Sequence, residues 1–394
     1  MRKKSAILTS NGQEAEAYEE IELTGSFGRN RGYAAEKERM VSAVRSVIYH
    51  ADSGKAVICG ATSYAKVEMF GKSKEKWLKK YIKQENGVPD ACTFRNVIKA
   101  IDTQQLHTVF VEWMRNVVES VTGVVAIDGK QARRTKDAKK PPLHVVSAFS
   151  AECGLVLGQL ACEEKSNEIT AIPRLLELLE INGCIVTIDA MGTQTEIAKK
   201  ITEKGADYIL SLKENQKTLY EDVRLFFEEY RTNSAGISPD CHAESHSQGH
   251  GRCESRTCYV CEDIGWLEGR KKWSGLAGIG VIFCKVEQAG KVSKQAHYFL
   301  YSRSGMTASQ VLEAKRSHWS IENQLHWVLD MQFREDESRA RVDNSAENLN
   351  VLRHWAYNVL KAETSMRGSF SDKQFKCLLD EAFLDKIVFS AFCS

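Results

Sequence analysis

The sequence predicts a mixed α/β fold in which one mixed sheet is flanked by helices. Near the middle of the chain, "GVVAID", "LHVVSAFSA" and "GLVLGQLAC" are typical of strands joined by short connections. An alternation of helix and strand follows, in "NEITAIPRLLELLEI", "CIVTID", "TEIAKKITEKG" and "ADYILSLK". Short connections produce antiparallel pairs, whereas helical crossovers produce parallel ones, so both kinds of pair are expected in one sheet.

The rest of the chain is divided by changes in periodicity. A chain of 394 residues exceeds one ordinary hydrophobic core and predicts two or three domains. Residues 1–40 are polar and contain several glycines, which predicts a flexible lead-in. Apolar residues recur at three- and four-residue intervals over residues 41–122, which predicts a helical domain. The sheet domain would occupy residues 123–394 and finish with helices at about 343–394.

Composition limits the compartment and the class of partner. No apolar run approaches the roughly 20 residues that cross a bilayer, and the N-terminus has no apolar signal segment. The 12 cysteines are scattered, which favours reduced thiols. We therefore expect a cytoplasmic protein that has no membrane partner. The 54 basic and 52 acidic residues nearly cancel, but six basic residues gather in "GKQARRTKDAKK", directly after Asp128. Such a cluster beside a carboxylate suits a polyanionic substrate.

Two aspartates occupy matching positions at the ends of predicted strands. Asp128 ends "VVAID" and Asp189 ends "CIVTID", and a glycine follows each closely. Ligand sites on α/β sheets form where strand ends open to solvent, so the two carboxylates would converge if their strands are neighbours. Either aspartate alone is also consistent with an ordinary turn.

A third carboxylate, Glu322, lies in a predicted long helix over residues 307–333. Glu322 stands on a polar face with His318 and His326, for which a solvated surface is the alternative interpretation. Beside that face runs a predicted core stripe of Ala314, Ile321, Leu325 and Val328.

Three converging carboxylates repel one another unless a cation lies between them. Hard oxygen ligands favour Mg²⁺ or Mn²⁺, and two such ions about 4 Å apart activate a nucleophile and stabilise the leaving oxygen of a phosphodiester. The residues therefore predict metal-dependent phosphoryl transfer on nucleic acid.

Several motifs, taken in order, resemble the insertion-sequence DDE transposases of the ISAs type, the family of the H-repeat-associated proteins. The resemblance covers about residues 56–360 and rests on "AIDGKQARR", "EKSNEITAIPRLLELLEINGCIVTIDAMGTQ", "GADYILSLKENQ", "HGRCESR" and "HWSIENQLHWVLDMQFREDESR". It implies a ribonuclease H-like sheet with Asp128, Asp189 and Glu322 as the catalytic, metal-binding triad. "GKSKEKWL" and "GVPDACTF" resemble the family's associated domain, which implies a helical segment that helps to bind DNA. Residues of about 216–303 resemble the β-rich insertion of related transposases, which can reach over bound DNA.

The resemblance also implies a function. We expect a prokaryotic, nucleoid-associated DNA transposase that cleaves double-stranded DNA at element ends and transfers the strand to target DNA, acting as a homodimer on DNA. A nuclease without strand transfer and a catalytically inactive DNA-binding protein are the alternatives. Candidate DNA contacts are Lys130, Arg133, Arg134, His250, Arg252, Lys315, His318 and Arg339.

Three points remain open in the sequence. The common pattern Tyr-x2-Arg-x3-Glu-x6-Lys is replaced here by Lys315, His318, Glu322 and Leu329, so Asp330 and Glu335 are alternative third ligands. The tryptophans of "HWSIENQLHW" fit an unpaired base, although helical tryptophans are more often core. Zinc is a competing interpretation of one cluster, although its spacing matches no standard finger: Cys241, His242, His246, His250, Cys253, Cys258 and Cys261.

Overall fold

The computed structural model describes most of the chain beyond residue 51. The described ranges are 6–8, 14–16, 52–81, 87–118, 120–136, 141–162, 168–232, 238–249 and 251–390. Within the predicted lead-in these include only β1 (Ala6–Leu8) and β2 (Glu14–Glu16), which pair antiparallel; the prediction of flexibility lies outside the described residues. Among the described helices, none combines the length and the apolarity that a membrane crossing requires.

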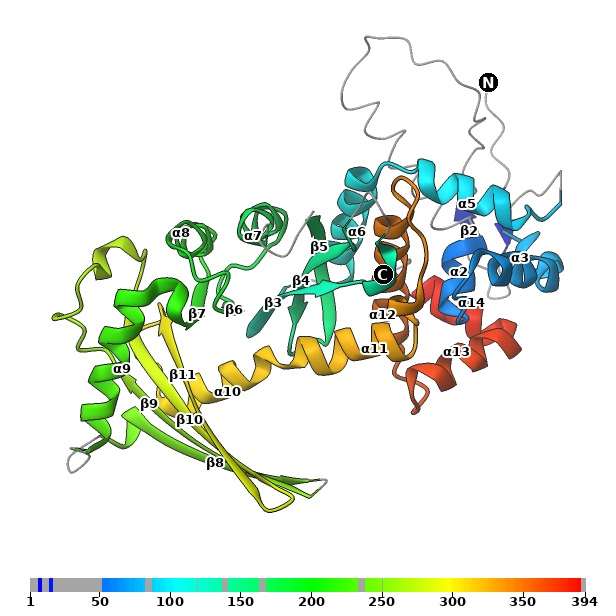
Figure 1. The fold of residues 1–394 in the computed structure, drawn as a ribbon. Helices are drawn as coiled ribbons and strands as arrows, with labels where there is room; N and C mark the ends of the chain where they lie inside the picture. The colour runs from blue at the N-terminus through cyan, green and yellow to red at the C-terminus, as the bar shows by residue number, and fades with distance from the viewer. Residues whose placement is uncertain are drawn as a thin grey trace, which may run out of the picture.

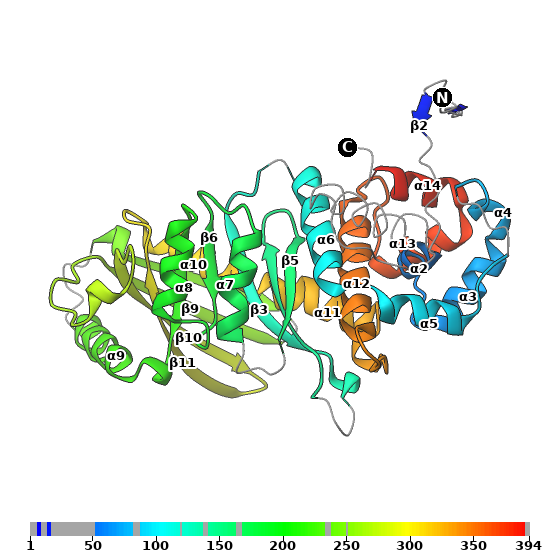
Figure 2. The same cartoon turned by 90° about the horizontal axis from the view of Figure 1, so that it is seen from above.

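A sheet of nine strands forms the centre of the molecule (Figures 1 and 2). Its strand order is β5-β4-β3-β6-β7-β11-β10-β9-β8. β3, β6 and β7 run parallel to one another, whereas the pairs β3–β4 and β4–β5 are antiparallel. The predicted mixed sheet is therefore confirmed. The first five strands in this order are β5 (Leu155–Cys162), β4 (His144–Ser150), β3 (Val124–Gln131), β6 (Ile185–Ile188) and β7 (Asp207–Leu212).

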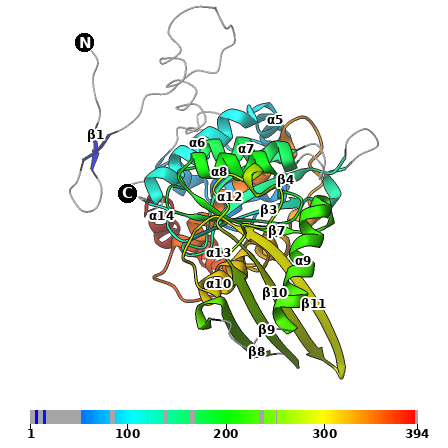
Figure 3. The ribbon, with the colours of Figure 1, turned by 90° about the vertical axis from the view of Figure 1, so that its left-hand side faces the viewer.

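Four further strands extend the sheet beyond β7. β11 pairs antiparallel with β7, and the hairpins of the insertion project past the helices as a long curved ribbon (Figure 3). Two elements here were not predicted: helix α9 (Lys217–Thr232) and strand β8. The side chains of β8 are mostly polar because it is an edge strand, so they lack the apolar alternation that marks a strand. The four strands are β8 (His242–Gly249), β9 (Arg252–Cys261), β10 (Gly278–Gln288) and β11 (Lys291–Tyr301).

Helices cover both faces of the sheet. α7 (Glu168–Leu178) and α8 (Thr195–Glu203) lie on one face, and the α10–η7–α11 segment lies on the other (Figures 1 and 2). The sequence predicts this segment as one helix, and its backbone stays helical through α10 (Ala308–His318), the unpredicted π-helical turn η7 (Ile321–His326) and α11 (Trp327–Met331). The predicted core stripe of the segment is buried, as expected.

The two ends of the described chain build one helical region. α12 packs against α2 and α5 and also, together with α6, against β5. The side chain of Asn348 on α12 donates hydrogen bonds to the carbonyls of Ile98 (2.7 Å) and Ile101 (2.9 Å) at the end of α5. Two of the predicted N-terminal helices, α2 and α5, thus pack against α12 as well as against α3. The helices are α2 (Asp52–Ile58), α3 (Tyr64–Ser73), α4 (Glu75–Leu78), α5 (Ala91–Ala100), α6 (Thr103–Val117), α12 (Ser345–Ala362), α13 (Phe370–Leu379) and α14 (Glu381–Ser390).

Replacing Asn348 with alanine should loosen this region. Two carbonyls would lose a buried donor, which costs about 1–3 kcal/mol of unfolding free energy. Urea denaturation measures the change, and Asn344→Ala is the matched control, because Asn344 is exposed and donates to the same Ile101 carbonyl at 2.9 Å. If both variants lose the same unfolding free energy, the burial of the Asn348 hydrogen bonds does not add to their contribution to stability.

Candidate active site

Asp128 and Asp189 lie side by side on neighbouring parallel strands. The last residue pair between β3 and β6 is Ile127 with Ile188, and the two aspartates are the next residues on each strand. β6 ends at Ile188, one residue before the predicted end at Asp189, but β3 continues to Gln131 because it remains paired with β4. Asp128 therefore lies within its strand, which corrects the expectation that the strand ends there. The Oδ1 atom of Asp189 accepts hydrogen bonds from the backbone N–H groups of Met191 (3.1 Å) and Gly192 (3.4 Å).

Glu322 is brought to the same face of the sheet by the π-helical turn η7, which packs against β3. The N–H group of Trp327 donates to the Glu322 carbonyl, five residues back, as in a π-helix. Ile321 and Leu325, on either side of Glu322 in this turn, are fully buried, whereas Glu322 itself is exposed. The apolar anchors therefore hold an accessible carboxylate near β3, where its charge acts on Asp128.

The charges of these carboxylates act on Asp128. Burial raises the pKa of Asp128 to about 7, and the negative charges of Asp189, Glu322 and Glu168 add to that rise. Among the residues that the structure describes, no three histidine, cysteine, aspartate or glutamate side chains lie close enough together to hold a metal ion. The three carboxylates are thus electrostatic neighbours, but they are not gathered at one coordination point.

Behind Asp128 lies a buried pair that the sequence pattern does not reveal. His144 Nε2 is 2.5 Å from Glu168 Oε1, and both side chains are almost fully buried. A Cβ atom at Gly129 would lie 2.3 Å from Glu168 Oε1 and 2.5 Å from His144 Nε2. Only glycine fits here, and the only signal in the sequence is the glycine that follows the aspartate.

Lys315 stands beside the second aspartate. Its Nζ atom donates to the hydroxyl of Ser211 on β7 at 2.7 Å. Burial lowers the pKa of Lys315 to about 8, against the attraction of Asp189, which raises it. This predicted DNA contact therefore has its cationic group at the carboxylate site.

Lys130, in contrast, does not take the position predicted for a DNA contact. Its side chain is only 11% exposed, and its Nζ atom donates to Asp330 Oδ1 (2.7 Å) and Glu335 Oε2 (3.0 Å). Glu335 also accepts from Asn350 Nδ2 at 2.9 Å and lies 3.5 Å from Arg353 Nη1. The two alternative third ligands, Asp330 and Glu335, are thus already held by Lys130.

His318 also departs from its predicted role. The residue is 7% exposed, and its Nδ1 atom is hydrogen-bonded to the Thr187 hydroxyl on β6 at 2.9 Å. The imidazole packs against the sheet and does not face a phosphate. Leu329, which replaces the lysine of the common pattern, is buried in the core.

The burial of His318 should appear in the pH dependence of stability. Burial lowers the pKa of His318 to about 3, whereas an unfolded histidine titrates near 6.5. Below about pH 6.5 the unfolded state binds a proton that the folded state cannot, so the free energy of unfolding falls, by at most about 1.4 kcal/mol per pH unit for this one group. Urea titrations of His318→Asn should show a shallower fall between pH 6.5 and 4 than the wild type shows. An unchanged slope would contradict a buried neutral imidazole.

The remaining predicted DNA contacts are arginines and one histidine. Arg133, Arg134 and Arg339 are exposed. Arg252 lies on β9, half-exposed, with its Nη2 atom 3.2 Å from Glu254 Oε2. His250 lies outside the described residues.

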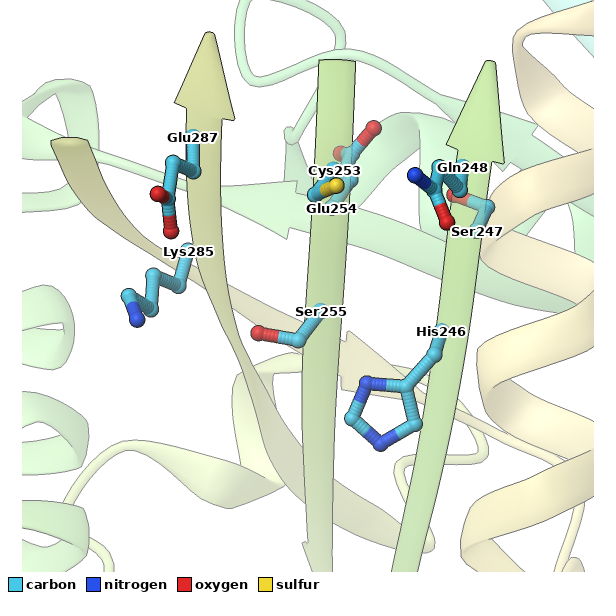
Figure 4. A pocket seen from close by; sticks show the side chains of 8 residues that line it. All are labelled: His246, Ser247, Gln248, Cys253, Glu254, Ser255, Lys285 and Glu287. Carbon is cyan, nitrogen blue, oxygen red and sulfur yellow. The ribbon is translucent and has the colours of Figure 1, made fainter. Parts of the chain in front are cut away.

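A separate cavity of about 350 Å³ opens on the ribbon of β8, β9 and β10, and Figure 4 shows its side chains. Acidic and basic groups are mixed in it, and none of the three carboxylates lines it. The described part of the predicted zinc cluster contains no group of ligands that could hold a metal. The lining residues are His246, Ser247, Gln248, Cys253, Glu254, Ser255, Lys285 and Glu287.

The tryptophans that flank Glu322 are not core residues. Trp319 is 38% exposed and Trp327 54% exposed, which corrects the preference for a core position. The guanidinium carbon of Arg256 lies 5.7 Å from the centre of the Trp319 ring. Aromatic surface is therefore accessible next to the carboxylates.

The fold is that of a mixed α/β protein, with a large mixed sheet flanked by helices. Its acidic site consists of the two adjacent aspartates and the glutamate of the helical segment that packs on β3. The family model described as "Transposase DDE domain" matches residues 119–359, and the model "DDE_Tnp_1-associated" matches residues 54–114. The chain belongs to this family, the insertion-sequence DDE transposases, as the resemblance predicted.

Individual relatives agree with this family. "Putative transposase YncI" from Escherichia coli O157:H7 is 37% identical over 342 residues, which are 85% of this chain and 87% of that protein. "H repeat-associated putative transposase YhhI" from Escherichia coli strain K12 is 36% identical over 341 residues, 84% of this chain and 89% of that protein. The solved piggyBac transposase synaptic complex with hairpin DNA aligns with a TM-score of 0.39 at 10% identity, covering 92% of this chain and 74% of that chain.

Proposed function

We propose that the protein is an active DNA transposase that cleaves DNA at element ends and transfers the cut strand to target DNA. Asp128, Asp189 and Glu322 would be its catalytic residues. The observation that carries the proposal is the register of β3 and β6, in which Asp128 and Asp189 directly follow the last residue pair. The strand order β5-β4-β3-β6-β7 supports the ribonuclease H-like fold that the resemblance implies.

The chemistry of the donors fits a divalent cation. The three groups are carboxylates, which are the hard ligands that Mg²⁺ and Mn²⁺ prefer. Burial and, after it, the negative charges of its neighbours raise the pKa of Asp128, and a cation bound there would stabilise the ionised carboxylate. Two bound Mg²⁺ or Mn²⁺ ions would supply Lewis acidity toward the phosphodiester and toward the attacking water or hydroxyl. To hold them, the carboxylates would have to move closer together than they are here.

The surrounding side chains would bind and orient the DNA. Lys315, beside Asp189, would attract the phosphate nearest the reacting bond. The exposed Arg133, Arg134 and Arg339 would neutralise neighbouring phosphates, and each such contact steepens the salt dependence of binding. We assign the helical segment, residues 41–122, to binding at element ends and the insertion, at about 216–303, to contact over the bound DNA. That the protein acts as a homodimer on the two element ends stays a prediction. Its association with the nucleoid stays a prediction as well.

A cleavage assay tests the proposal. A labelled duplex carrying the element ends is incubated with purified protein in Mg²⁺, in Mn²⁺ and in chelator. We expect metal-dependent nicking and joining, which Asp128→Asn and Asp189→Asn each reduce by at least about 100-fold, as the loss of one preorganised electrostatic group does. DNA binding should persist, and Asp263→Asn, an exposed aspartate in the insertion, is the matched control.

Two outcomes would favour the alternatives. Tight DNA binding without cutting under any metal condition would identify an inactive DNA-binding protein. Nicking that never leads to joining, even with a precut end supplied, would identify a nuclease.

A further inference from the structure

His326 contacts the first aspartate from the helical segment that carries Glu322. Its Nδ1 atom lies 3.6 Å from Asp128 Oδ2, and the two side chains are 13% and 19% exposed. His326 is the last residue of the π-helical turn η7, and Glu322 is the second. One contact therefore joins strand β3 to the segment that carries the third carboxylate.

The environment of the imidazole assigns its proton. Nε2 is buried and, among the described residues, has no hydrogen-bond partner. Asp128 offers only acceptor atoms when it is ionised, so the ring nitrogen that faces it must be the donor. A bare buried lone pair at Nε2 costs less than a buried N–H group without an acceptor. When Asp128 is ionised, the partners thus place the proton on Nδ1, directed at its carboxylate.

The helix around His326 is firmly anchored. Leu325 on one side and Val328 and Leu329 on the other are buried in the core. The imidazole therefore cannot follow Asp128 if that side chain rotates. An imidazole fixed beside one carboxylate oxygen limits the orientations that the carboxylate can take.

We propose that His326 is a positioning residue for Asp128: its Nδ1 atom, 3.6 Å from Oδ2, lies just beyond hydrogen-bond distance and closes to a hydrogen bond when the carboxylate is ionised, which aligns Asp128 with Asp189 and Glu322. This inference rests on the proposed function, since it concerns the same site. It assigns to His326 no contact with DNA or with the reacting atoms.

Paired substitutions test this role. In His326→Asn the amide nitrogen takes the place of Nδ1, whereas in His326→Gln it takes the place of Nε2, and His326→Leu removes both. Two readouts are measured for the full-length protein: the rise in melting temperature as Mn²⁺ is added, and the Mn²⁺ concentration that gives half-maximal nicking. We expect His326→Asn to stay within about 3-fold of the wild type, while the Gln and Leu variants need roughly 10–100-fold more Mn²⁺, the cost typical of losing a group that orients a metal ligand.

A buried histidine elsewhere controls for general destabilisation. His354 on α12 is fully buried and is hydrogen-bonded to Gln159. His354→Leu should lower the melting temperature without metal but leave the Mn²⁺ dependence unchanged. The comparison of His326→Asn with His326→Gln stays decisive even if the Leu variant does not fold.

The outcomes separate the inference from the proposed function. If the wild type shows neither Mn²⁺-dependent stabilisation nor nicking, the proposed function is wrong. If the wild type responds to Mn²⁺ and the Asn, Gln and Leu variants all respond equally, the positioning role is wrong. If His326→Asn loses the Mn²⁺ response as completely as Asp128→Asn does, the imidazole is itself a ligand, which also overturns a positioning role.

Discussion

Replacing Glu322 with glutamine is expected to reduce nicking by at least about 100-fold while the protein stays as stable as the wild type. The side chain is exposed, and exposed substitutions usually change the unfolding free energy by less than about 0.5 kcal/mol. Glutamine keeps the shape but removes the charge that acts on Asp128. Nicking rates and urea denaturation of the same preparation measure the two effects.

Glu335→Gln is the matched comparison, and it should behave in the opposite way. Burial alone would raise the pKa of Glu335, but Lys130 and Arg353 hold it at about 2. Glutamine would leave the buried Arg353 without the Glu335 carboxylate and would leave Lys130 with Asp330 as its remaining hydrogen-bonded carboxylate, so we expect a loss of about 3–5 kcal/mol. Because the pKa is depressed, this stabilisation is present above about pH 4.3 and is lost as the pH falls toward about 2.

The pair of variants decides which carboxylate is the third catalytic group. Glu322 is supported if Glu322→Gln loses nicking but keeps its stability. Glu335→Gln should then lose stability but keep its nicking activity per folded molecule. If Glu322→Gln keeps full nicking activity, another carboxylate is the third catalytic group.

Gly129→Ala is also expected to reduce both stability and nicking strongly. The new Cβ atom would press against His144 and Glu168, which are buried and bonded to each other and therefore cannot turn away. Overpacking of this kind costs about 1–3 kcal/mol. β3 would have to shift next to Asp128, so nicking should fall by more than the loss of folded protein explains.

Melting temperature and nicking rate per folded molecule measure these two consequences. Gly249→Ala on β8 is the control, because nothing lies within 4 Å of its Cβ position. If Gly129→Ala keeps the wild-type melting temperature and nicking rate, His144 and Glu168 move aside more easily than their burial indicates.

The strands that lead to the aspartates were predictable, because the apolar runs before Asp128 and Asp189 are typical of buried strands, although β3 continues past Asp128. The core stripe around Glu322 was predictable for the same reason, since its spacing matches a helix buried on one side. Periodicity does not report what lies across the sheet. For this reason the ion pairs of Lys130 and the burial of His318, both produced by distant segments, could not be predicted.

The insertion shows a second limit. β8 is an edge strand with polar side chains, and its two histidines, together with Cys241 and the cysteines of β9, suggested a metal site instead. The π-helical turn at Glu322 also leaves no mark in the apolar spacing. Both features depend on pairing and backbone hydrogen bonds that a pattern of residue types does not encode.

The dependence of the first helices on α12 has a consequence for synthesis on the ribosome. Asn348 bonds to a carbonyl 250 positions earlier in the chain, and α2 and α5 have α12 as their packing partner. Until α12, which begins at Ser345, has been synthesised, the growing polypeptide exposes the apolar faces of these helices. They then need protection from aggregation. A transcript cut short before this point would therefore yield a chain that contains all three carboxylates but lacks a complete fold.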